Sequence, residues 1–236
     1  MKKHLILLVV AQLFCVTSFS QLSYNWGFTG GDSPAPESSI NNVVVDNAGN
    51  YYCIGTLIGS VDMNPNGTPD TINTISTDAI IMKYDVNGIL QWGFPIGGNG
   101  HDFGLDIGVD SSGNVIAAGT FNTYVDFDPS PAVADTFILH SAGANDIFFL
   151  KLDANGNFLW ANQLYGGTMG TKQTNDLDID VNGNIYATGT FSANLDMDPS
   201  PGTLTFTPVG SSDGFVIKMN ANGDLQYAHQ FGSLSS

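Results

Sequence analysis

The chain has 236 residues and a formal net charge of −16, with 22 acidic residues against six lysines and arginines. A chain this acidic is repelled by nucleic-acid phosphates and by anionic lipid surfaces, which argues against partners of either kind. The same charge suits divalent cations. Beyond the N-terminal segment no apolar stretch is long enough to cross a bilayer, so we expect no membrane insertion.

The N-terminal residues predict export. Lys2 and Lys3 precede a short apolar run that is followed by small residues, which is the arrangement of a secretory signal peptide. We therefore expect residues 1–20 to be removed and the mature chain, 21–236, to be secreted or held at the cell surface. Its single cysteine, Cys53, cannot form an intrachain disulfide and has no activating base nearby, so we interpret it as a buried packing residue.

Three copies of one sequence unit cover almost the whole mature chain. Aromatic residues mark its period of about 67 residues, at Trp26, Trp92, Trp160 and Tyr227. Two sequence motifs recur between these aromatic residues in the same order. The first is DNAGNYYCIGT (46–56), DSSGNVIAAGT (110–120) and DVNGNIYATGT (180–190). The second is DAIIMKYDVNGILQW (78–92), DIFFLKLDANGNFLW (146–160) and DGFVIKMNANGDLQY (213–227).

The residue pattern of each copy predicts β-strands. A short alternating strand leads to a D-x-x-G-N turn, whose glycine accepts the positive φ of a tight hairpin. After a second strand comes an almost continuous apolar run, typical of a strand covered on both faces, and then a second glycine turn before the aromatic strand. No segment shows the 3.6-residue apolar period of a helix. Four hairpin-connected strands per unit describe a β-propeller blade. A β-solenoid would have much shorter coils, and a chain of sandwiches would have more strands per unit.

The prediction is an all-β, β-propeller-like fold of three four-stranded blades, approximately 27–92, 93–160 and 161–227, with 228–236 as a terminal strand. The aromatic segment at 24–31 would be a spare strand of a further blade. Because rings generally close with four to eight blades, three blades form an open arc. The missing blades lie in a longer chain, or two chains associate head to tail. We favour the longer chain, since self-association would leave the spare strands redundant.

The sequence motifs VDSSGNVIAAGTF and DIFFLKLDANGNFLWA, with VDFDPSP between them, resemble the SBBP β-propeller repeat of exported bacterial proteins. The resemblance spans roughly residues 24–232. It implies a propeller, usually of about seven blades, within a longer bacterial surface or secreted protein. It implies no particular enzyme activity.

A recurring pair of oxygen-bearing side chains is the first candidate site. VDFDPSP (125–131) returns as LDMDPSP (195–201) and, altered, as VDMNPNG (61–67). These side chains suit a hard cation such as calcium, yet one loop offers only two of the six to eight oxygens that calcium takes. The alternative, which we favour, is that they cap turn amides ahead of a proline. We expect no other cofactor. The six residues are Asp62, Asn64, Asp126, Asp128, Asp196 and Asp198.

Two further sets of polar residues recur once per unit. One stands inside the apolar run and consists of Lys83, Lys151 and Lys218. We interpret these lysines as structural, with the aliphatic stem packed between blades and the ammonium paired with a turn aspartate. The other set lies four residues before each D-x-x-G-N turn, on the strand expected nearest the axis, and consists of Asn42, Asp106 and Asp176. These side chains line a channel or are simply solvated.

The sequence lacks the usual catalytic signatures. His101, His140 and His229 are isolated, and no HExxH, GxSxG or Cys–His motif is present. We favour an exported, non-enzymatic module that binds a protein or glycan or acts as a scaffold within a larger protein. The second hypothesis is a carbohydrate-active hydrolase or lyase on a propeller scaffold. Asp106 and Asp176 are its first candidates, because catalytic carboxylate pairs are spatial rather than sequential.

Overall fold

The computed structural model describes residues 38–64, 67–130, 136–141 and 145–233. The predicted signal peptide at 1–20 and the aromatic segment at 24–31 lie outside the described residues. Within these ranges the secondary structure consists of β-strands, with no helix, and so with none that is long and apolar enough to cross a membrane. The all-β prediction is confirmed.

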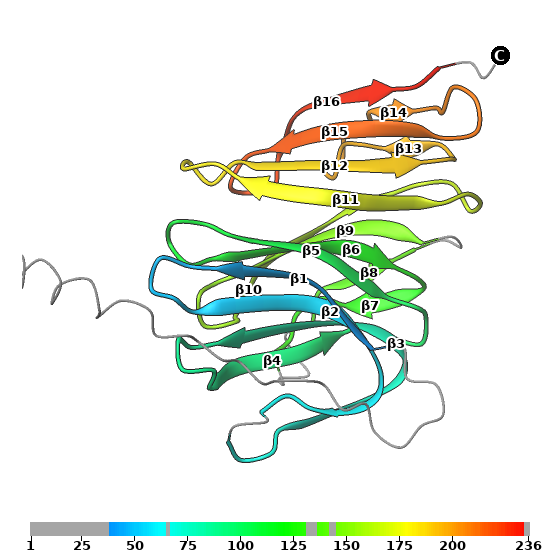
Figure 1. Cartoon of the computed structure of the whole chain (residues 1–236). Coiled ribbons are helices and arrows are strands. Elements are labelled where there is room, and N and C mark those ends of the chain that lie inside the picture. Colours follow the sequence, from blue (N-terminus) through cyan, green and yellow to red (C-terminus); the bar gives the residue numbers. More distant parts are fainter. Residues whose placement is uncertain (1–37, 65–66, 131–135, 142–144, 234–236) are drawn as a thin grey trace, which may run out of the picture.

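Most of the strands form three antiparallel four-stranded sheets (Figure 1). The first sheet has the order β1 (Ser39–Val45), β2 (Tyr51–Asp62), β3 (Thr71–Tyr84) and β4 (Leu90–Ile96). The second has the order β5 (Phe103–Val109), β6 (Val115–Phe121), β9 (Asp146–Leu152) and β10 (Phe158–Leu164). The third has the order β11 (Lys172–Ile179), β12 (Ile185–Phe191), β15 (Asp213–Met219) and β16 (Leu225–Phe231).

In the second and third sheets a short two-stranded hairpin lies in the connection between the two middle strands. In the second sheet this hairpin pairs β7 (Tyr124–Asp126) with β8 (Ile138–His140), and in the third it pairs β13 (Leu195–Asp196) with β14 (Thr205–Phe206). In the first sheet the same extension is continuous with β2 and β3, which pair beyond an irregularity at Gly59 as far as Asp62 and Thr71. This hairpin or extension carries the recurring pair of oxygen-bearing residues in each copy.

The sequence repeat is a structural repeat, because the three sheets share one register. Each first strand has a bulge at the same place, just before Asn42, Asp106 and Asp176. The glycines of the three D-x-x-G-N turns have φ between 78° and 85°, as the turn type requires. The predicted unit boundaries at 92/93 and 160/161 fall inside β4 and β10. The predicted terminal strand at 228–236 is, as far as Phe231, part of β16.

The sheets stack face to face, and the core lies between them (Figure 1). One apolar cluster joins the first sheet to the second, and another joins the second to the third. The middle sheet is covered on both faces, so that every residue of β6 and β9 is buried. Within the described ranges the three sheets remain separate.

Candidate functional site

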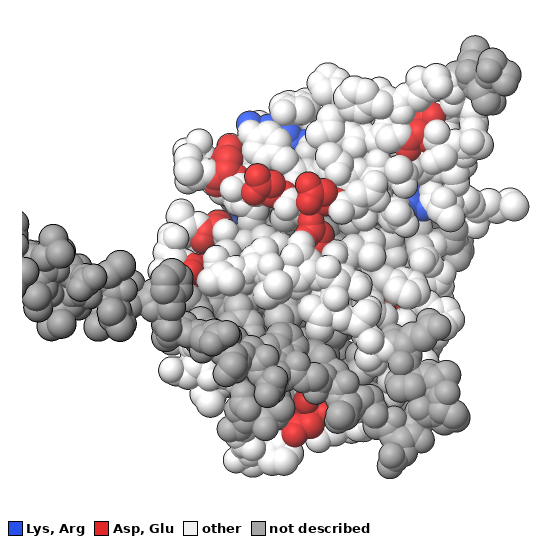
Figure 2. Space-filling model, in the orientation of Figure 1, with Lys and Arg blue, Asp and Glu red and all other residues white. Residues whose placement is uncertain are grey.

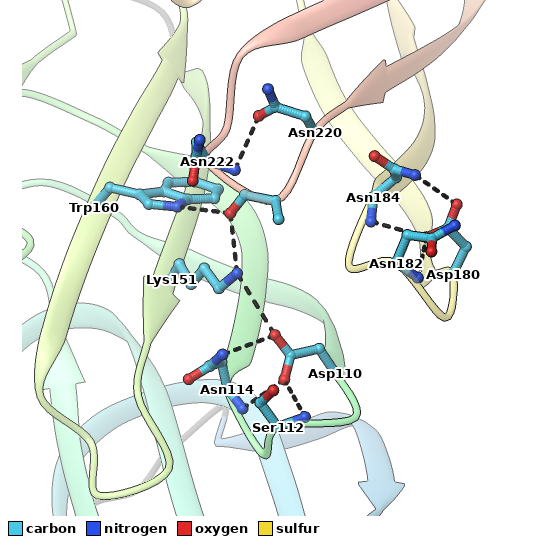
Figure 3. A network of polar contacts seen from close by, with 11 residues as sticks. Asp110, Ser112, Asn114, Lys151, Trp160, Asp180, Asn182, Asn184, Asn220 and Asn222 are labelled. Carbon is cyan, nitrogen blue, oxygen red and sulfur yellow. Dashed lines mark hydrogen bonds and ion pairs between the residues drawn. The ribbon is translucent and has the colours of Figure 1, made fainter.

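Each of the first two sheets binds the second hairpin turn of the sheet that follows it. Lys151 Nζ donates a hydrogen bond to the backbone oxygen of Ala221 at 3.0 Å, and Trp160 Nε1 approaches the same oxygen at 3.4 Å (Figure 3). At the first junction Lys83 Nζ and Trp92 Nε1 donate to the oxygen of Ala154 at 2.7 and 3.2 Å. We call this lysine–tryptophan–carbonyl arrangement the clasp.

The clasp requires glycine in the turn that it binds. Gly156 and Gly223 both have φ of 84°, which a side chain disfavours. A Cβ on Gly156 would also lie 3.0 Å from the Trp92 ring, and one on Gly223 would lie 3.2 Å from the Trp160 ring. The indole therefore lies directly against the glycine backbone, and the clasp combines packing with hydrogen bonding.

The recurring lysines occupy two kinds of surroundings. Lys151 is almost fully buried and lies 3.6 Å from the turn carboxylate of Asp110. Burial acts to raise the pKa of Asp110, but hydrogen bonds from Asn114 and Ser112 and the charge of Lys151 outweigh it and leave that pKa lowered. Lys83 and Lys218 lie instead over tyrosine rings, at 5.1 and 4.9 Å from the ring centroids. Among the described residues, the predicted pairing of the ammonium with a turn aspartate is thus found only for Lys151.

A buried ion pair joins the second and third sheets at the other end of β9. Asp146 Oδ1 lies 3.1 Å from Lys172 Nζ, and both side chains are almost completely buried. The same oxygen accepts the backbone N–H of Gly166 at 3.1 Å, and Asp146 Oδ2 accepts from Gln163 Nε2 at 2.7 Å. The close approach of the two charges and the additional hydrogen bonds offset the cost of burying this pair. Removal of either partner would leave the other charge buried alone, which is costly.

The equivalent positions at the first junction carry two carboxyl groups, Asp78 and Asp102. Burial raises the pKa of Asp102 to about 6, against the hydrogen bonds from the backbone of Asn122 and Gly98, and the charge of Asp78 adds to the rise. Burial also raises the pKa of Asp78. The sequence analysis predicted neither of these contacts between sheets, Asp146 with Lys172 or Asp78 with Asp102. The available signal was an aspartate at the start of the second motif in every copy, namely Asp78, Asp146 and Asp213.

The paired acidic loops have the geometry of capped turns. In each loop the first aspartate accepts two backbone N–H groups through one oxygen, at distances of 2.8–3.1 Å. These aspartates are Asp62, Asp126 and Asp196. The second residues bind locally as well: Asp128 and Asp198 each accept a backbone N–H two positions on, and Asn64 donates to Thr68. No cluster of three or more metal-ligating side chains occurs in the described ranges. That these loops serve as turn caps rather than calcium sites stays a prediction.

Asp106 lies where the three sheets meet. Its carboxylate accepts hydrogen bonds from the side chain of Asn42, from the backbone of Leu177 and from its own neighbour Ile107. It is buried, and burial raises its pKa. Asp176 is exposed. The structure thus brings Asn42 and Asp106 together as a structural contact between the first strands of the sheets.

The D-x-x-G-N turns line a surface hollow of about 490 Å³. Its wall combines carboxylates, amides and hydroxyls with the stem of Lys83, and acidic side chains form a band along β11 and this end of the sheets (Figure 2). Residues from all three turns contribute, among them Asp46, Asn47, Asp110, Ser111, Asp180 and Val181. This hollow is the polar concave surface that we take as the candidate ligand site.

Neither Cys53 nor the histidines add a catalytic group to this site. Cys53 is fully buried, and burial raises the pKa of its thiol to about 12, so the thiolate is suppressed at neutral pH. This agrees with the predicted packing role. His140 stacks on Tyr124 at a ring distance of 4.0 Å, away from the turns that line the hollow.

Comparison with known proteins gives two distant relatives. The chain is 31% identical over 129 residues to an uncharacterized WD repeat-containing protein of Acanthamoeba polyphaga mimivirus, a match that covers 50% of this chain and 8% of that protein. It is 24% identical over 200 residues to the regulatory protein FlaEY of Caulobacter vibrioides, which covers 83% of this chain and 20% of that protein. The chain therefore spans a small part of the curated relatives that it matches. No protein-family model matches it.

Proposed function

We propose that this chain is a run of β-propeller blades of the SBBP type, and that it serves as a non-enzymatic binding or scaffold module in an exported bacterial protein. Three features support a propeller: four antiparallel strands per unit, a common register, and first strands that lie side by side, with β5 in contact with β1 and β11. The name of the mimivirus relative, a WD repeat-containing protein, points to the same class of fold.

One observation carries the functional proposal. Recurring polar side chains such as those of Lys83, Lys151, Asp106 and Asp126 hold the units together or shape their turns. The turn-lined hollow offers a polar surface for a ligand, and its mixture of amides, hydroxyls and carboxylates suits a glycan or a polar protein segment. The acidic band disfavours nucleic acid and anionic lipid as ligands.

The three sheets would be consecutive blades of a ring that other blades complete, in a protein longer than this chain. The predicted signal peptide supports export to the medium or the cell surface. We assign no cofactor, and we interpret the paired acidic loops as turn caps.

The test is a binding screen of the full chain against bacterial surface glycans and proteins, with turnover followed in the same samples. We expect saturable binding that Ser111→Arg abolishes, because Ser111 is exposed on the wall of the hollow. The matched control, Gln226→Arg, places the same charge on exposed β16 and should leave binding intact. Turnover of a substrate without any binding partner, or equal binding by both variants, would refute the proposal.

A further inference from the structure

The third sheet has a face that corresponds to the face with which the second sheet binds the third. In the second sheet this face includes Ile116, Ala118, Phe149 and Lys151, all of which are buried. At the equivalent positions of the third sheet, Tyr186, Val216 and Lys218 are half-buried and Thr188 is exposed. Tyr227, in the place of Trp160, is 42% exposed. We call Tyr186, Thr188, Val216, Lys218 and Tyr227 the outer face.

The outer face holds the donor half of a clasp. Lys218 pairs with Tyr227 across β15 and β16 in the register in which Lys151 pairs with Trp160. The phenol O–H of Tyr227 is a hydrogen-bond donor, as the indole N–H is. Lys218 lies over the ring of Tyr186 at 4.9 Å, and no turn carbonyl is bound to it within the described ranges. The third sheet therefore repeats the donors of the first two clasps without the acceptor.

A second and independent observation is the incomplete bonding of Asp213. This carboxylate is almost fully buried and binds Gln230, just as Asp146 binds Gln163. Asp146 Oδ1, however, accepts from Gly166 N–H and Lys172 Nζ, whereas Asp213 Oδ1 is buried and has no hydrogen-bond partner among the residues that the structure describes. Both partners of Asp146 belong to the segment that follows β10 and opens the next sheet. A buried acceptor without a partner is destabilising, which makes this site a candidate for a missing contact.

We propose that the outer face binds one further four-stranded sheet of the same repeat type. That sheet would present a glycine-turn carbonyl to Lys218 and Tyr227, and a backbone N–H or a cation to Asp213. This inference rests on the proposed function and names the partner of the outer face. The occupant is an additional repeat unit rather than a second copy of this chain. In a second copy the carbonyls of Ala154 and Ala221 are already bound, and Val86, in the equivalent turn of the first sheet, is engaged as well.

The experiment compares the full chain with an extended chain in which residues 165–231 are repeated once after Phe231, supplying a fourth sheet with its own Ala-Asn-Gly turn. Repeat proteins gain stability from each nearest-neighbour interface. We expect the extended chain to unfold in a single transition at a higher urea concentration. Lys218→Met, made in the third sheet and not in its added copy, should lower the urea midpoint of the extended chain and leave that of the full chain nearly unchanged. Lys151→Met, the matched control, should lower both.

Three results would overturn the inference. If the third sheet is a terminal cap, the added unit will unfold separately, or Lys218→Met will have the same effect in both chains. If the full chain forms a dimer by light scattering and Lys218→Met abolishes that dimer, the outer face binds a second copy instead. None of these results depends on ligand binding at the hollow, so failure here and failure of the proposed function are distinguishable.

Discussion

Replacement of Asp102 by asparagine should change how the stability of the protein depends on pH. The Asp102 side chain is completely buried and accepts the backbone N–H groups of Gly98 and Asn122 at 3.0 and 2.9 Å. Burial is the main cause that raises its pKa from 3.8 to about 6 in the folded protein. The folded state therefore binds this proton more tightly than the unfolded state does.

The direction and the size of the effect follow from that difference. The free energy of unfolding should be highest, with respect to this group, below pH 4, and should fall as the pH rises through about 6. A rise of about two pKa units corresponds to at most about 3 kcal/mol. Asp78 acts in the same direction, since burial raises its pKa too. The turn aspartates with lowered pKa, such as Asp110, contribute stability that is lost only as the pH falls below about 4.

Urea unfolding followed by tryptophan fluorescence at about pH 4.5 and about pH 7 measures this difference. The parent chain should be less stable at the higher pH, and Asp102→Asn should reduce the difference, whatever its effect on the absolute stability. Asp178→Asn, at an exposed position, is the control and should keep the parent's pH dependence. The reasoning is refuted if Asp102→Asn unfolds with the same pH dependence as the parent.

Three further predictions concern the clasp and the acidic loops. Lys151→Met should lower the free energy of unfolding by about 2–3 kcal/mol in urea, because it leaves the carboxylate of Asp110 without its cation; a change below about 0.5 kcal/mol would contradict the clasp. Gly223→Ala should cost at least about 1 kcal/mol, because φ is positive there and the Trp160 ring lies against the backbone; an unchanged urea midpoint would count against this packing. Millimolar calcium should leave the melting temperature of the parent and of Asp128→Asn unchanged; a rise that is smaller in the variant would show that the loops bind calcium.

The sequence allowed the local structure to be predicted because the local structure depends on local signals. Glycine in the D-x-x-G-N and D-x-N-G turns, the alternating first strand and the continuous apolar run each specify their element within a few residues. The threefold repetition then predicted which residues occupy equivalent places, and the structural role of Lys151 followed from it.

The contacts between sheets were not predictable in the same way. The acceptor of the clasp is the backbone oxygen of Ala221, and a backbone acceptor leaves no mark on the residue type. Lys172 pairs with Asp146 at a position where the second copy has Asp102, so repetition hides the pairing instead of indicating it. The burial of Asp106 depends on how closely the first strands approach, which strand periodicity alone does not fix.

The proposed function requires that the chain bind a ligand at the turn-lined hollow without transforming it. Isothermal titration of the full chain with bacterial cell-surface polysaccharides tests this most directly, because binding gives heat that saturates whereas turnover gives heat that continues. We predict saturable heat for at least one polysaccharide, unchanged chain length of that polysaccharide afterwards, and loss of the signal in Ser111→Arg. Continuous heat with shortened polysaccharide, abolished by Asp176→Asn in a chain that remains folded, would show instead that the protein is a hydrolase or lyase.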